Sequence, residues 1–319
     1  MPTLGIWTPS APAPALFPRR TRRAVHYLRQ HGWQVRTTAS FAGLSRASAA
    51  SPEVLADELH ELIRCDEVSA VMAATGGWTS ALVLPHLDYG LLRAAGKPLI
   101  GYSDLTTVLW TAYAHGAPAI HGPMLVSEFG HVTGPFAYSV DQLRWALSGL
   151  AATLGPPARW SDDNPWWDTE DDRPLQMHAA GPWRVVRPGR AQGPLLAGCL
   201  LALTGLFGTP YMPDTGGHIV FLEDCGIAPD QFLALLAQWQ AAGRLASIAA
   251  LVIGRHSRPL AAPGGYADFD DALLHVLGDV PFPVLADVDF GHTEPKLSLP
   301  LGRHVTISTE PLSIHVGAA

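Results

Sequence analysis

The stretch IGYSDLTTVLW, residues 100–110, sets the architecture of the N-terminal half of the chain. Apolar residues lead into Gly101, a serine follows, and the remainder has the apolar spacing of one helix face. A serine at such a strand-to-helix turn stands above a sheet, where its hydroxyl can meet both a base and a substrate carbonyl. An ordinary helix cap, with Ser103 or Asp104 bonded to the first turn, gives the same pattern. The spacing alone leaves both interpretations open.

Strand and helix patterns alternate on the N-terminal side of this stretch. Apolar or alternating segments predict strands, and segments with apolar residues three and four apart predict helices. The strands are expected at residues 4–8, 33–37, 68–73 and 97–100, and the helices at 20–30 and from Ser51-Pro52 onward. This alternation predicts a mostly parallel sheet covered by helices on both faces.

The amino-acid composition and the periodicity of the sequence change near residue 150. Residues 155–183 are rich in proline, aspartate and tryptophan and show no period, which is typical of a linker or a functional loop. Beyond them, short apolar segments alternate with a single clear helix at about 229–242. We therefore predict an α/β protein in three parts, namely an N-terminal domain (1–157), a linker and active-site loop (158–183), and a smaller mixed α/β C-terminal domain (184–319).

Composition and charge exclude several classes of protein. Of 319 residues, 48% are hydrophobic and 15% charged, which favours a packed globular protein over a disordered one. The 21 basic and 28 acidic side chains give a net charge of −7, which argues against binding of a nucleic acid polymer. The one basic cluster, Arg19, Arg20, Arg22 and Arg23, is expected to be the solvated face of a helix.

Membrane and secretion signals are not evident in the sequence. The longest apolar stretch, residues 194–208, is too short for a membrane span and is interrupted by glycine, and the N-terminus lacks the pattern of a signal peptide. The cysteines Cys65, Cys199 and Cys225 are widely spaced and predict neither a disulfide framework nor a zinc site. These observations favour a protein of the cytoplasm.

Three further segments contain candidate catalytic groups. The glycine pair Gly76-Gly77 follows an apolar strand, and amides at such a turn can stabilise negative charge, although a plain tight turn is the commoner explanation. Glu223 ends an apolar strand, where a plain exposed strand end is an equally good explanation, and His292 lies in a loop bounded by glycine and proline. A serine, a histidine and a carboxylate can supply a nucleophile, its base and the group that orients the base. The chain has 14 histidines, so spacing does not select His292.

A resemblance to a known family makes that selection. The segments at 72–78, 84–89, 101–106, 121–123, 208–211, 221–224 and 288–295 resemble, in order, the LD-carboxypeptidase family of serine peptidases, and most of all its microcin C self-immunity branch. The resemblance implies Ser103 as nucleophile, His292 as general base and acid, and Glu223 as the carboxylate that orients it. It also implies an oxyanion site at the amides of Gly77 and Asp104.

The same resemblance implies the domain structure and the assembly. Members of the family have a flavodoxin-like N-terminal domain and a smaller C-terminal domain, form homodimers, and use neither a metal nor another cofactor. The sequence departs from the family at two places. Trp78-Thr79-Ser80 follow the glycine pair where the murein-processing branch has tyrosine and glycine, and Cys199 stands where members usually have asparagine.

A tryptophan-rich segment, residues 160–172, resembles the loop that covers the active site in the self-immunity branch. Trp166 or Trp167 is a candidate to stack on a planar group such as a nucleobase, and anchoring of the loop is an equally good interpretation. With Gly76 and Trp78, these tryptophans form the expected substrate-binding set. The loop carries six carboxylates but lacks the glycine and spacing of a calcium loop, so no metal site is predicted.

The expected function is hydrolysis of an amide bond in a small aminoacyl or peptidyl conjugate, as self-protection or detoxification. The main alternative is an LD-carboxypeptidase that removes terminal D-alanine from muropeptides during cell-wall recycling. The alternative from another class is a small-molecule binding protein without enzymatic activity on the same scaffold.

Overall fold

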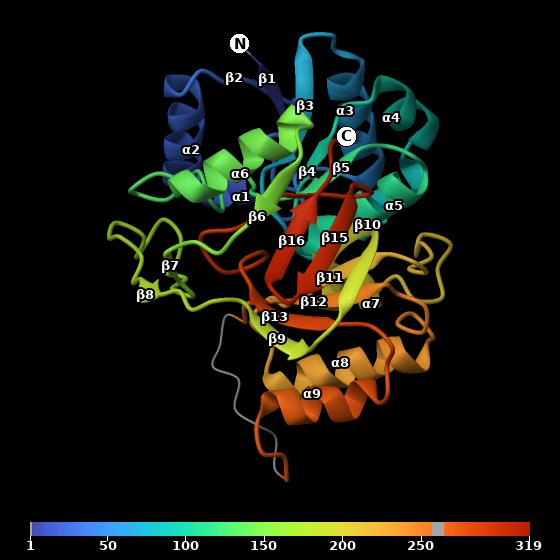
Figure 1. Cartoon of the computed structure of the whole chain (residues 1–319). Coiled ribbons are helices and arrows are strands. Elements are labelled where there is room, and N and C mark those ends of the chain that lie inside the picture. The colour runs from blue at the N-terminus through green and yellow to red at the C-terminus, as the bar shows by residue number, and fades with distance from the viewer. Residues whose placement is uncertain (1, 257–264) are drawn as a thin grey trace.

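The computed structural model describes residues 2–256 and 265–319. Within them the chain forms two large sheets and one short pair of strands (Figure 1). In this described part, no helix is both long and apolar enough to cross a membrane.

The first sheet carries the parallel strands that the sequence predicts. Its order is β14-β5-β4-β3-β1-β2, and the order 2-1-3-4-5 within it is that of a flavodoxin-like sheet, which confirms the predicted fold class. The added strand β14 runs antiparallel to β5 and comes from the far end of the chain. The strands are β1 (Thr3–Trp7), β2 (Gln34–Thr37), β3 (Val68–Ala73), β4 (Leu99–Gly101), β5 (Ala119–His121) and β14 (Leu299–Pro300).

Helices cover both faces of the first sheet because its strands are apolar on both faces. Leu4 and Ile6 of β1 pack in a core with α2 and α6, whereas Trp7 packs in a second core with α3, α4 and α5. The helical segments of this half are α1 (Ala13–Leu16), α2 (Pro18–Gln30), α3 (Pro52–Arg64), α4 (Tyr89–Ala95), α5 (Thr106–Ala114), α6 (Ala137–Ser148) and the 3₁₀ turns η1 (Ser80–His86) and η2 (Ser103–Leu105).

The second sheet is mixed, as the sequence predicts. Its order is β6-β16-β15-β10-β11-β12-β13-β9, with β10 to β13 parallel and the outer pairings antiparallel. Its strands are β6 (Ala152–Leu154), β9 (Arg184–Arg187), β10 (Arg190–Cys199), β11 (Ile219–Glu223), β12 (Ala250–Gly254), β13 (Val284–Val288), β15 (His304–Thr309) and β16 (Leu312–Val316).

Helices α7 (Leu200–Thr204), α8 (Pro229–Ala241) and α9 (Phe269–Leu277) belong to this half. Helix α8 matches the helix expected at about 229–242, but α9 packs beside it, so the prediction of a single clear helix here was incomplete (Figure 1). Helix α9 is short, and the side chain of Asp268 caps its first turn by accepting a hydrogen bond from the amide of Asp271.

The two sheets meet where α5 packs against the end of β10. The indole of Trp110 donates a hydrogen bond of 2.9 Å to the carbonyl of Ala197, and the amide of Cys199 donates one of 3.3 Å to Thr106 Oγ1. Gly198 permits this approach, since a Cβ there would lie 2.2 Å from a methyl carbon of Thr106. The carboxyl ends of β10 and β11 therefore lie next to the turn that carries Ser103.

The loop after β6 is fastened to the start of α2. It contains the short pair β7 (Arg159–Trp160) and β8 (His178–Ala179). Asp168 accepts hydrogen bonds from the amides of Arg19 and Arg20, and Asp171 binds the Arg20 guanidinium at 3.1 Å. Arg20 is fully buried, so the expectation that its cluster is a solvated face was wrong for this residue. Its charge is matched by a carboxylate far along the chain.

Candidate active site

The backbone at Ser103 adopts a conformation that serine rarely takes. Its φ is +60°, in the left-handed region, and it is the first residue of the 3₁₀ turn η2, two residues beyond the end of β4. Neither η2 nor α5 has a side-chain cap, so the serine does not serve as the helix cap that its sequence also allowed. Such a conformation raises the free energy of the folded state by about 1–3 kcal/mol, so it persists only where the surrounding structure enforces it.

Neighbouring side chains fix this turn. Asp104 accepts hydrogen bonds from Ser10 Oγ at 2.6 Å and from the Ser80 amide at 2.9 Å. Gly76 lies so close that a Cβ on it would meet the Ser103 Cβ at 2.8 Å. The buried carboxylate of Asp104 thus fixes the turn by hydrogen bonds, and Gly76 packs directly against the side chain of Ser103.

His292 and Glu223 complete a row of hydrogen bonds that starts at Ser103. His292 Nε2 lies 3.0 Å from Ser103 Oγ, and His292 Nδ1 lies 2.6 Å from Glu223 Oε2. Ser103 comes from the first sheet, Glu223 ends β11 of the second sheet, and His292 lies in the loop after β13. The ring of Tyr102 packs edge-on against the His292 ring, with the centroids 4.9 Å apart. The structure therefore brings the three residues selected by the resemblance into one chain of contacts.

The charge on Glu223 and the pKa of His292 are compatible with His292 as a base that takes a proton from a serine. Burial alone would raise the pKa of Glu223, but His292 and His121 lower it to about 2, so the carboxylate stays ionised. Burial alone would lower the pKa of His292, but Glu223 outweighs it and raises that pKa above its usual value. An ionised acid behind the ring fixes the tautomer with the proton on Nδ1, which leaves Nε2 to accept the serine proton.

Gly291 is a site residue that the sequence reasoning quoted without giving it a role. Its φ is +88°, and a Cβ there would lie 2.3 Å from Glu223 Oε2. Gly254 is similarly close, since its Cβ would meet the Cβ of Glu223 at 2.8 Å. Two glycines thus make room for the carboxylate behind His292. The one sequence signal for this role was the position of Gly291 directly before the candidate histidine His292.

We expect Gly291→Ala to lower kcat by about 100-fold or more, because the new methyl group displaces Glu223 and a 1 Å misplacement can cost about that much. The matched control is Gly32→Ala, with nearly the same φ of +85° but no atom within 4 Å of the added Cβ. Steady-state kinetics and thermal unfolding of both variants separate backbone strain, which they share, from loss of the carboxylate's position. Equal kcat values for the two variants would contradict this role for Gly291.

The two amides expected at the oxyanion site belong to Asp104, which follows Ser103, and to Gly77, which follows the glycine that packs on Ser103. Asp104 is the second residue of η2, and the first amides of a helix have no partner within it. Within residues 2–256 and 265–319, no hydrogen bond engages the amide of Gly77. Gly77 has φ +154°, and a Cβ there would meet Ser10 Oγ at 2.4 Å, so glycine is required. Gly77 and Ser103 line the same cavity, so an oxyanion site formed by these amides stays a prediction.

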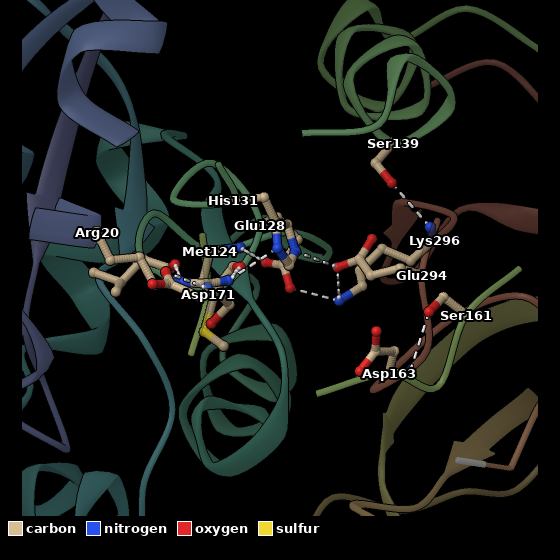
Figure 2. Close-up of polar contacts among 12 residues, drawn as sticks. Arg20, Met124, Glu128, His131, Ser139, Ser161, Asp163, Asp171, Glu294 and Lys296 are labelled. Carbon is tan, nitrogen blue, oxygen red and sulfur yellow. Dashed lines mark hydrogen bonds and ion pairs between the residues drawn. The ribbon is translucent and has the colours of Figure 1, made fainter. Parts of the chain in front are cut away.

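Ser103 and His292 open into a cavity of about 630 Å³ with polar walls, called the polar cavity here. Buried charges line one wall, and Figure 2 shows how they converge. Lys296 Nζ lies 2.6 Å from Glu128 and 3.1 Å from Glu294, and Tyr102 donates a hydrogen bond of 2.8 Å to Glu128. His131 approaches Glu294 at 3.9 Å. Sequence reasoning missed this cluster. The described residues include no group of three or more side chains that could hold a metal ion.

The tryptophans expected to bind substrate occupy different surroundings. Trp167 lines the polar cavity, with the Arg20 guanidinium 4.6 Å from its ring centroid and Phe17 edge-on at 5.2 Å. Trp166 is 74% exposed and does not line that cavity. Trp78 is 80% exposed and lines a second cavity beside Ser103. Trp167 therefore anchors the loop and also faces the cavity, and stacking on a substrate stays a prediction.

A serine, a histidine and a carboxylate form one hydrogen-bonded row at the junction of a flavodoxin-like sheet and a mixed sheet, an arrangement typical of serine hydrolases. Residues 4–122 match the LD-carboxypeptidase N-terminal domain and residues 192–307 match the LD-carboxypeptidase C-terminal domain. The chain belongs to the LD-carboxypeptidase family.

Curated relatives cover nearly the whole chain. A Vibrio cholerae protein named as a carboxypeptidase is 32% identical, over 95% of this chain and 91% of its own length. The microcin C7 self-immunity protein MccF of Escherichia coli is 28% identical, over 98% and 92%. The structure of MccF with aspartyl sulfamoyl adenosine superimposes with a TM-score of 0.92 at 26% identity, over 100% of this chain and 96% of that one.

Proposed function

We propose that the chain hydrolyses an amide bond in a small aminoacyl or peptidyl conjugate, with Ser103 as nucleophile, His292 as general base and acid, and Glu223 as the orienting carboxylate. The observation that carries the proposal is the row Ser103–His292–Glu223, with spacings of 3.0 and 2.6 Å at the wall of one cavity. In the first step, Nε2 of His292 takes the Ser103 proton while Oγ attacks the carbonyl carbon. The amides of Gly77 and Asp104 donate to the resulting oxyanion.

The second half of the reaction uses the same groups. The protonated His292 gives its proton to the leaving amine, and the acyl group stays on Ser103 as an ester. Water then attacks the ester carbonyl as His292 takes its proton, and His292 gives that proton to Ser103 Oγ as the ester bond breaks and the acid leaves. This chemistry needs no cofactor or metal ion.

The likeness to MccF favours a conjugate over a muropeptide as the substrate. Structures of MccF contain glutamyl sulfamoyl guanosine and aspartyl sulfamoyl adenosine, and they superimpose over the full length of this chain. Trp167 at the polar cavity is suited to stack on a planar base, and Gly76 leaves room beside Ser103. The exposed Trp166 is proposed to cover the bound substrate from the loop's surface.

Removal of terminal D-alanine from muropeptides is the second candidate, because relatives include a murein peptide carboxypeptidase by name from Bacillus subtilis at 26% identity. The test compares hydrolysis of aspartyl and leucyl sulfamoyl adenosine with that of an L,D-tetrapeptide, followed by mass spectrometry. Turnover of the tetrapeptide alone would overturn the preferred substrate class. A small-molecule binder without activity would form no covalent adduct on Ser103 with an acylating probe.

The pH dependence of the reaction follows from His292. Its neutral form is the base, so we expect kcat/KM to be low in acid and to rise to a plateau as pH passes its pKa. Because Glu223 raises that pKa, the acid limb should have its midpoint above about 6.5, the usual value for histidine. A pH–rate profile of the wild-type protein measures the midpoint. A midpoint near pH 5 would show that Glu223 does not act on the ring.

We also propose that the protein works as a homodimer in the cytoplasm. Cys65, Cys199 and Cys225 are all free thiols, as is usual in a reducing compartment. Light scattering of the purified protein measures its mass directly, and a monomer at micromolar concentration would contradict the dimer.

A further inference from the structure

A second cavity lies beside Ser103 and differs in chemistry from the polar cavity. It has a volume of about 270 Å³, and the two cavities share Gly77, Ser103 and Cys225. The residues that line only this cavity are mostly small or apolar, namely Trp78, Ala81, Cys199, Leu201, Ala202, Gly205 and Leu206, and the two polar ones are Asp104 and Thr107. We call it the acyl pocket.

The position of His292 decides which half of a substrate enters which cavity. In the proposed reaction, His292 must give a proton to the leaving amine, so that amine lies on the side of the imidazole. His292 lines the polar cavity and is not among the residues that line the smaller one. With the leaving group in the polar cavity, the side chain of the acyl residue points into the smaller cavity, on the far side of Ser103.

The acyl pocket offers no partner for a charged side chain. No lysine, arginine or histidine from the described part of the chain lines it. Its one carboxylate, that of Asp104, is already bound to Ser10 Oγ and the Ser80 amide and is buried. The thiol of Cys199 behaves as a small hydrophobic group. A carboxylate that entered this pocket would lose its hydration without gaining a cation.

We propose that the acyl pocket selects an uncharged, apolar side chain on the acyl half of the substrate, of the size of leucine or methionine. This inference rests on the proposed function and narrows its substrate class. It separates this chain from MccF, whose solved complexes hold aspartyl and glutamyl conjugates. The volume of the pocket and the lack of a basic side chain among the described residues that line it both favour leucyl over aspartyl conjugates.

The first test measures kcat/KM for leucyl and aspartyl sulfamoyl adenosine, which share one leaving group. We expect the leucyl conjugate to be hydrolysed about 100-fold faster or more, because a pocket discriminates by about 10- to 200-fold for apolar differences alone. A ratio near one, or one in favour of aspartate, would overturn the inference.

The second test changes the pocket and reads the same ratio. Ala202 lies on α7, partly exposed, so Ala202→Lys places a cation at the pocket without disturbing the core. We expect the ratio of leucyl to aspartyl kcat/KM to fall at least tenfold. Because the comparison is a ratio, partial loss of active enzyme does not alter it. An unchanged ratio would show that the acyl side chain does not lie in this pocket.

The third test separates this inference from the proposed function. Calorimetry measures the Kd of both conjugates for the Ser103→Ala variant, which binds without turnover. A leucyl preference of tenfold or more supports the inference even if the wild-type protein hydrolyses neither conjugate, an outcome that would refute only the proposed reaction. A leucyl preference below tenfold would overturn the inference, and so would the absence of measurable binding of both conjugates.

Discussion

Ser103→Ala is expected to lower kcat by about 10⁴-fold or more, while leaving the fold and substrate binding in place. The methyl group cannot attack a carbonyl, and loss of a nucleophilic serine in other hydrolases leaves only the catalysis provided by the oxyanion site and binding. The measurement is hydrolysis of the conjugate found active in the wild-type protein, with substrate saturating.

Thermal unfolding of Ser103→Ala provides the control. The variant keeps a side chain with Cβ at φ +60°, so the strain at this turn is retained and the unfolding temperature should change little. A variant that folds normally and keeps more than a tenth of the wild-type kcat would remove Ser103 from the role of nucleophile. An acylating probe should then modify a different residue.

Glu223→Gln is expected to lower kcat by about 10³- to 10⁴-fold with a smaller change in KM. The neutral amide no longer favours a positive charge on His292, and it no longer enforces the tautomer with the proton on Nδ1. The pKa of His292, which Glu223 raises, should fall, so the acid limb of the pH–rate profile should move to lower pH. That shift distinguishes loss of the orienting charge from general damage to the site.

Glu58→Gln is the matched control for Glu223→Gln. Glu58 is also a buried carboxylate, but it binds the amide and hydroxyl of Ser40 and lines neither cavity beside Ser103. Its replacement should lower stability and leave kcat at the wild-type value. If Glu223→Gln instead kept the wild-type kcat and acid limb, another group would have to orient His292.

The fold of the N-terminal half was predictable because apolar strands between amphipathic helices have a strong local signature. Strand β3 spans the residues expected for it, 68–73. Helix α9 was also predictable and was overlooked, because its buried residues Phe269, Ala272, Leu273 and Leu277 have the spacing of a helix face and Asp268 precedes them as a cap.

The buried charges could not be predicted, because the burial of a charge depends on its partner. Arg20 is buried against Asp171, which lies 151 residues away, and Lys296 against Glu128, which lies 168 away. The residues next to an arginine or a lysine in the sequence do not show whether its side chain is paired with a carboxylate or surrounded by water. For the same reason, His292 was selected by a resemblance to a family and not by the residues around it.

The contact between Ser103 and His292 joins residues 189 positions apart, one from each sheet. Strand β14, only a few residues beyond His292, adds to the first sheet next to β5 and so ties the histidine loop to the sheet that carries the serine. A chain still emerging from the ribosome has made its serine long before its histidine. In the proposed mechanism, Ser103 of such a chain has no base, so it cannot hydrolyse a substrate until the C-terminal strands have been synthesised.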